Sequence, residues 1–118
     1  MQNEIHNISN FQLEEGKLSC NVSYDANHEI FSGHFPEQPV VPGVCTMDMI
    51  KELLQTALDK KLILRSTGQV KFLQLILPDV QPEVLITWQI ADNGYNVAAS
   101  LKANEAFLFK MNGVFEAV

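Results

Sequence analysis

The sequence predicts an α+β fold in which one long helix packs against a curved antiparallel sheet. Residues 17–24 alternate apolar and polar residues, and strand patterns return after Arg65 and continue to the C-terminus. Between them, residues 44 to about 60 repeat their apolar positions at three- and four-residue steps. With only one helix available, its apolar side must be buried against the concave face of the sheet. The 118 residues contain no linker-like stretch and no repeat, so residues 1–118 are expected to form a single domain.

The first two elements are expected to be strands joined by a tight turn. Apolar side chains occupy every second position of the later strand, at Leu18, Cys20, Val22 and Tyr24. An earlier strand from about Ile5 to Leu13 would meet it through the turn Glu14-Glu15-Gly16.

The helix is expected to have a wide apolar side, because six apolar residues share it: Met47, Ile50, Leu53, Leu54, Ala57 and Leu58. This width indicates that most of the helix is enclosed. Lys60, Lys61 and Arg65 follow within six positions. They could accept an acidic partner, although a solvated helix end is the more ordinary interpretation.

Two or three antiparallel strands, linked as a meander, are expected after the helix. The first has an apolar face made of Val84, Ile86, Trp88 and Ile90. A tight hairpin turn follows at Asp92-Asn93-Gly94, where residues that accept positive φ gather. The alternation then resumes at Tyr95, Val97, Ala99 and Leu101 and, past a turn at 103–105, at Phe107, Phe109 and Met111. An edge strand of such a sheet invites pairing with a second copy.

Composition excludes several classes of function. A net charge of −6 argues against binding nucleic acid, because phosphates would repel an acidic surface. No segment has the roughly 20 apolar residues needed to cross a bilayer. The polar start at Met1–Glu4 does not resemble a secretory signal, so a cytoplasmic protein is expected. Cys20 and Cys45 lack metal spacing, and neither a metal nor a cofactor is expected.

The most informative stretch is GHFPEQPVVPGV, residues 33–44. Its three prolines fix φ at every third residue, which favours an extended, rigid loop. His34 lies at its start, Gly43 opens the helix, and Asp48 is the one acid on the early helical turns. A positioned histidine, a free amide at a helix N-terminus and a carboxyl among apolar residues are the parts of an acid/base site.

Residues 27–36 and 39–44, with an acid fourteen residues after the histidine, resemble the (3R)-hydroxyacyl-[acyl carrier protein] dehydratases of type II fatty acid synthesis. Lys71-Phe72 followed by Pro78-Asp79 is a weaker similarity to the same family. The resemblance implies a hot-dog fold, in which a curved antiparallel sheet wraps one long central helix. It also implies a homodimer, or a higher oligomer of dimers, in which His34 and Asp48 of one site come from different subunits.

Dehydration of a 3-hydroxyacyl thioester needs a base and an acid. Neutral His34 is expected to remove the C2 proton, and Asp48, kept protonated by an apolar tunnel, to protonate the departing C3 hydroxyl. The Gly43 N–H would hold the developing enolate oxygen. Phe35, Val44 and Phe72 are expected to bind the acyl chain. Lys60, Lys61 and Arg65 are expected to dock the acyl carrier protein.

Two positions depart from the family pattern. Asp48 stands where most of the short enzymes have Glu, although Asp is usual in the related dehydratase/isomerase branch, and Glu52 stands where the family tends to have Gln. A hot-dog acyl thioesterase and a non-catalytic acyl-binding subunit are therefore alternatives. Asp48 could also be an early-helix acid that interacts with the helix dipole. His6 and His28 are interpreted as structural or surface residues.

Overall fold

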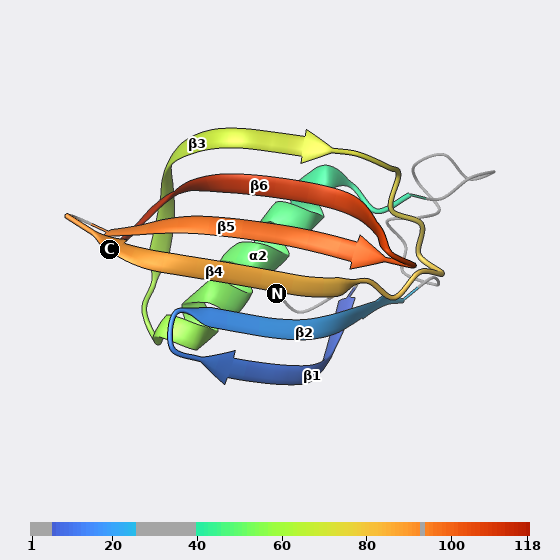
Figure 1. The fold of residues 1–118 in the computed structure, drawn as a ribbon, viewed down its shortest axis with the longest axis horizontal. Helices are drawn as coiled ribbons and strands as arrows, with labels where there is room; N and C mark the ends of the chain where they lie inside the picture. The colour runs from blue at the N-terminus through green and yellow to red at the C-terminus, as the bar shows by residue number, and fades with distance from the viewer. Residues whose placement is uncertain (1–5, 26–39, 93) are drawn as a thin grey trace.

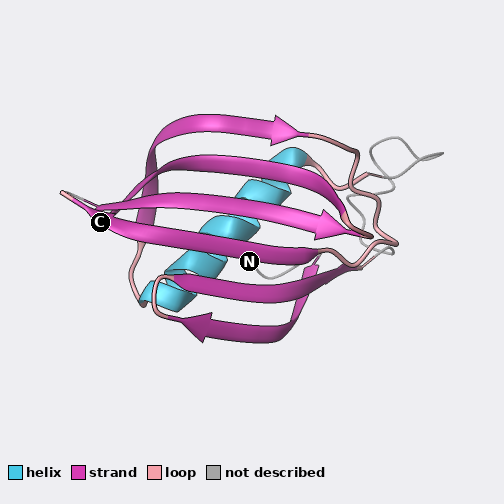
Figure 2. Cartoon of the chain, in the orientation of Figure 1, coloured by secondary structure: helices cyan, strands magenta, loops and turns pink. Residues whose placement is uncertain are grey.

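The computed structural model describes residues 6–25, 40–92 and 94–118, which form one six-stranded antiparallel sheet and one helix. The helix crosses one face of the curved sheet obliquely (Figure 1, Figure 2). This is the hot-dog arrangement that the sequence predicts, with strand order β1-β2-β4-β5-β6-β3. The elements are β1 His6–Glu14, β2 Lys17–Tyr24, α2 Gly43–Leu58, β3 Leu62–Phe72, β4 Glu83–Ala91, β5 Gly94–Ala103 and β6 Ala106–Ala117. No helix among the described residues is long and apolar enough to span a membrane.

The N-terminal hairpin confirms the prediction over the described residues 6–24. β1 and β2 pair in antiparallel register from His6 opposite Tyr24 to Glu14 opposite Lys17. The inward positions of β2 are almost fully buried, as the alternation requires: Leu18, Cys20 and Val22. β1 is an edge strand, and its apolar residues after His6 stay partly exposed.

The helix lies where it is expected but is rotated slightly. Its fully buried residues are Thr46, Met49, Ile50, Leu53 and Leu54, whereas Met47, Ala57 and Leu58 are only partly buried. The buried side of the helix is therefore displaced by about one residue from the expected side. The helix ends at Leu58 because Asp59 adopts a left-handed conformation at the C-cap, with φ 53° and ψ 46°.

Four strands follow the helix rather than two or three. β4, β5 and β6 form the expected meander, and Ala91 pairs with Gly94 across a two-residue connection. The additional strand is β3, which begins at Leu62, before Arg65, and pairs with β6 at the far edge of the sheet. Its middle, Arg65 to Gln69, is polar, and its register slips twice, so no period-2 pattern marks it.

The core lies between the helix and the inward side chains of the sheet. Val84, Ile86 and the expected inward residues of β5 are buried. Ile90 is an exception at 84% exposed, because it pairs with Tyr95 near the end of β4, and these ends of β4 and β5 extend past the helix (Figure 1). A register shift between β5 and β6 buries both Leu108 and Phe109 and leaves Phe107 exposed, against the expected inward alternation.

Candidate active site

The start of α2 presents free backbone donors. Pro42 is the N-cap, with φ −61° and ψ 143°, and no side chain caps the helix. The Pro42 carbonyl accepts hydrogen bonds from the N–H groups of Cys45 at 3.0 Å and Thr46 at 3.4 Å. Within the described residues, no acceptor faces the N–H of Gly43, and the first turn holds no acidic residue. As far as the described part of the chain goes, the Gly43 N–H is unoccupied, and the positive end of the helix dipole favours an anionic oxygen there.

The segment between β3 and β4 fixes this helix start in place. Val41 N–H donates to the Ile76 carbonyl at 2.7 Å, and Ile76 is buried in the core. Leu73 N–H in turn donates to the Leu108 carbonyl of β6 at 2.9 Å. The amide end of the helix is thus attached, through two backbone hydrogen bonds, to the sheet.

Gly43 and Phe72, two of the expected site residues, lie in contact. A Cβ placed on Gly43 would lie 2.7 Å from Cζ of Phe72, closer than two carbon atoms can approach. The Phe72 ring packs at 4.9 Å, centroid to centroid, on the buried ring of Phe109. Phe72 remains 53% exposed, so one face of its ring is available to a ligand beside the Gly43 amide. The absence of a side chain at residue 43 is what leaves room for that ring.

Gly43→Ala is expected to lower the free energy of unfolding by about 1 kcal/mol, at the low end of overpacking costs, because the half-exposed Phe72 ring can turn aside. Thermal unfolding measures the change. Phe72→Leu in the same chain removes the ring atoms that the new Cβ would meet and should recover the loss. If the single variant unfolds at the wild-type temperature, the close contact does not restrict residue 43.

Asp48 lies on the second turn of the helix, and its side chain is exposed. It shares this solvent-facing side with Val44, which is 66% exposed. The described residues of one chain do not form the apolar tunnel expected around Asp48, so the tunnel stays a prediction for the assembled dimer. The alternative role is also weakened, because the helix dipole acts mainly within the first turn and Asp48 lies beyond it.

A buried phenol and a thiol lie near Asp48, and the sequence did not single out their combination. Burial, and then the neighbouring Cys45, raise the pKa of Tyr24. Its hydroxyl is buried and has no hydrogen-bond partner among the described residues. Burial and the charge of Asp48 raise the pKa of Cys45, while burial raises the pKa of Cys20 to about 11. Both thiols are therefore protonated at neutral pH, which argues against thiol catalysis.

His34, His28 and Phe35 lie outside the described residues. The described residues on either side of that segment lie near the site. Asp25 follows Tyr24, which interacts with Cys45 on the first turns of α2, and Val40 precedes the helix start by three residues. The described structure resumes at Val40, three residues before Gly43.

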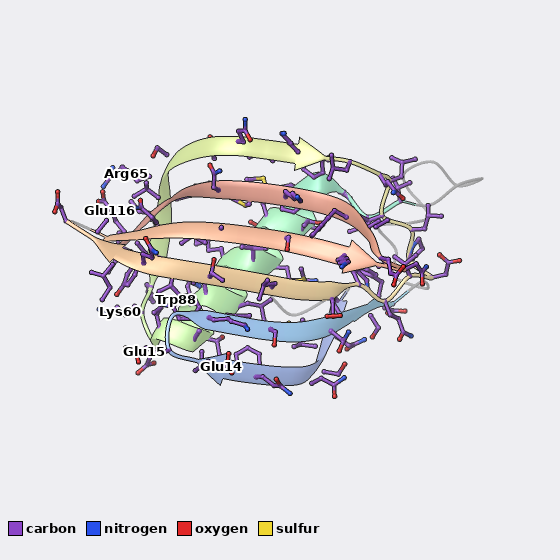
Figure 3. All side chains as sticks on the ribbon, viewed as in Figure 1. Glu14, Glu15, Lys60, Arg65, Trp88 and Glu116 are labelled. Carbon is purple, nitrogen blue, oxygen red and sulfur yellow. The ribbon has the colours of Figure 1, made fainter. Side chains whose placement is uncertain are left out.

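The expected docking cluster lies at the other end of the molecule. Figure 3 shows Lys60 and Arg65 opposite the end at which α2 begins, and Arg65 belongs to β3 rather than to a helix end. Lys60 Nζ donates to the Tyr95 hydroxyl at 3.0 Å, and Arg65 pairs with Glu116 at 3.0 Å. Lys60 and Arg65 therefore already have partners within the chain. The third cation, Lys61, is exposed.

His6 has the structural setting expected of it. It is buried, and its Nε2 lies 3.9 Å from Oε2 of Glu52 on the helix. Glu52 is half-exposed rather than fully solvated. Among residues 6–25, 40–92 and 94–118, no three His, Cys, Asp or Glu side chains gather closely enough to hold a metal ion.

Comparison with known sequences identifies one family. The model described as ApeI-like, ApeI dehydratase, matches residues 10–108. The 3-hydroxyacyl-[acyl-carrier-protein] dehydratase FabZ of Bacillus cereus is 39% identical over 51 residues, which are 42% of this chain and 35% of that relative. The match thus spans about a third of the length of this curated relative.

Comparison with solved structures supports the fold. The dehydratase heterocomplex ApeI:P from Xenorhabdus doucetiae contains a chain with a TM-score of 0.74 and 22% identity, and the match covers 94% of this chain and 93% of that one. A putative thioesterase from Shewanella oneidensis has a TM-score of 0.62 and 12% identity, with 99% and 86% covered. At these sequence identities the similarity concerns the fold alone. The dehydratase chain and the thioesterase share that fold, so it does not distinguish the two activities.

Proposed function

The chain belongs to the ApeI-like dehydratase family, and from this premise we propose that it dehydrates (3R)-3-hydroxyacyl thioesters of acyl carrier protein to trans-2-enoyl thioesters. The proposal depends mainly on the Gly43 N–H, which has no hydrogen-bond acceptor among the described residues and lies at the start of α2 beside the half-exposed Phe72 ring. A thioester oxygen needs this kind of donor as negative charge develops on it. Residues 1–118 would act as one cytoplasmic domain that needs no cofactor.

In this mechanism, His34 takes the proton from C2, and the electron pair of the C2–H bond becomes the new double bond. The C3–O bond breaks as Asp48 donates its proton, so the hydroxyl leaves as water. The Gly43 N–H stabilises the enolate oxygen between the two steps. His34 has then gained one proton and Asp48 has lost one, and a proton must pass from the first to the second before the next turnover. Val44, Phe35 and Phe72 would contact the acyl chain.

A second copy of the chain would complete the site. Asp48 is exposed on the single chain, and a carboxylic acid is kept neutral by removal from water. Apolar side chains near the start of α2 are also exposed: Val44, Phe72, Leu73 and Leu75. A homodimer that covers this area would bury apolar surface and enclose Asp48 at once. The X. doucetiae neighbour belongs to a heterocomplex, so a related partner chain is the other arrangement to test.

The reverse reaction tests the proposal. Purified protein is mixed with crotonyl and longer enoyl pantetheine thioesters, and hydration is followed as loss of the enoyl thioester absorbance. A dehydratase hydrates the double bond and leaves the thioester intact. Release of free acid would instead identify a thioesterase. Binding of the thioester without any conversion, by a folded oligomer, would identify an acyl-binding subunit.

A further inference from the structure

A furrow runs along the outer face of the sheet, on the side away from the helix. It follows β5, where Ala98 and Ser100 are short, between the longer side chains of β4 and β6. The hollow has a volume of about 430 Å³. Its lining side chains include Leu85, Thr87, Phe107, Lys110 and Asn112, together with Lys71 from β3.

Three lysines surround this furrow. Lys110 Nζ lies 4.0 Å from the centre of the Phe107 ring, and Lys102 Nζ lies 5.4 Å from it. Lys71 stands directly opposite Lys110 in the pairing of β3 with β6. Like charges placed opposite each other on neighbouring strands are unfavourable. In a chain of net charge −6, this concentration of cations is not required by the fold.

The three lysines are free to meet an anionic partner. None has a carboxylate within ion-pair distance in the described parts of the chain, although Glu83 is opposite Lys102 across the pairing of β4 with β5. Exposed Leu85 and Phe107 supply apolar contact beside the cations. A surface of this composition fits a ligand that is acidic and partly apolar.

The furrow also lies close to the candidate active site. Lys71 is followed by Phe72, whose ring is on the opposite side of β3 and touches the position of Gly43. One strand therefore separates the furrow from the free amide. Lys60, Lys61 and Arg65 instead lie near the far end of the 16-residue helix, about 24 Å away at 1.5 Å per residue.

We propose that this furrow, bordered by Lys71, Lys102, Lys110 and Phe107, is the surface on which the acyl carrier protein docks through a surface that is acidic and partly apolar. The proposal rests on the proposed function, which makes a carrier-linked thioester the substrate. Charge complementarity favours this occupant. A second copy seated furrow to furrow would place lysine against lysine, and nucleic acid would be repelled by the overall negative charge.

The test is Lys71→Glu with Lys110→Glu, matched in charge by Lys60→Glu with Lys61→Glu. Values of kcat/KM are measured with carrier-linked and with pantetheine-linked substrate. With carrier-linked substrate, the kcat/KM of the furrow variant should fall about tenfold, mainly through a higher KM, because two exposed charge contacts are reversed. With pantetheine-linked substrate it should stay within about twofold of wild type. The kcat/KM of the control variant should stay within about threefold of wild type with both substrates.

Three results would overturn the docking proposal. The furrow variant could lose kcat/KM equally with both substrates, it could lose none, or the loss could be confined to the Lys60/Lys61 variant. The affinity of unacylated carrier protein for each variant is measured separately, so the result does not depend on catalysis. If wild type hydrates no thioester, the proposed function fails, while a weaker affinity of the furrow variant still supports docking. Light scattering completes the test, since a changed oligomeric state would make the furrow an interface between copies.

Discussion

His34→Ala is expected to lower kcat by about 10²- to 10⁴-fold, the usual contribution of a positioned general base. Without the imidazole, no other group in the proposed site removes the C2 proton. The sheet and helix should persist, because the described core is built entirely without residue 34. The measurement is hydration of an enoyl thioester, with circular dichroism to verify folding.

The matched control for this variant is His28→Ala, six residues earlier in the same segment. Because His28 is interpreted as structural or a surface residue, its loss should change kcat by less than about threefold. Near-normal turnover by the His34 variant would show that the base has been assigned to the wrong residue. An equal loss in both variants would indicate that the segment, rather than one imidazole, is what matters.

Asp48→Asn is expected to reduce kcat by about 10²-fold or more, because an amide cannot give up a proton to the departing hydroxyl. The side chain is exposed, so folding stability should change by no more than about 0.5 kcal/mol. Asp48→Glu keeps the acid and lengthens the side chain by one methylene, and it should retain measurable activity. Enoyl hydration and thermal unfolding measure both effects.

Glu52→Gln serves as the control for Asp48, since Glu52 lies one helical turn further on and removal of its charge is the same chemical change. A loss of kcat below about threefold is expected, because the ion-pair partner of Glu52 among the described residues is the buried His6, at 3.9 Å. If Asp48→Asn is as active as wild type, Asp48 has no part in proton transfer.

Much of the fold was predictable because burial follows simple periods. The inward residues of β2 and β5 alternate without interruption, and a two-residue turn joins β4 to β5. β3 was missed because its polar middle gives no apolar pattern and its pairing with β6 alone makes it a strand. Phe107 was assigned to the wrong face because a register shift cannot be read from alternation.

The candidate site was only partly predictable. Gly43 and Phe72 were both selected from the sequence, but their contact joins residues 29 positions apart. Asp48 was expected to lie in an apolar tunnel, and in one chain its side chain is exposed although Met47 and Met49 flank it in the sequence. On a helix, however, successive residues point about 100° apart, so apolar neighbours in sequence do not enclose a side chain. The lysines of the furrow come from three strands, and no local pattern could bring them together.

The solvent-facing position of Asp48 has a kinetic consequence. In the proposed dimer, Asp48 leaves water only when two chains associate, so the rate per chain would depend on the protein concentration. Dilution below the dissociation constant of the dimer would then abolish activity while every chain stayed folded. The total activity would rise more steeply than the protein concentration. The level of synthesis of the chain would therefore regulate the activity.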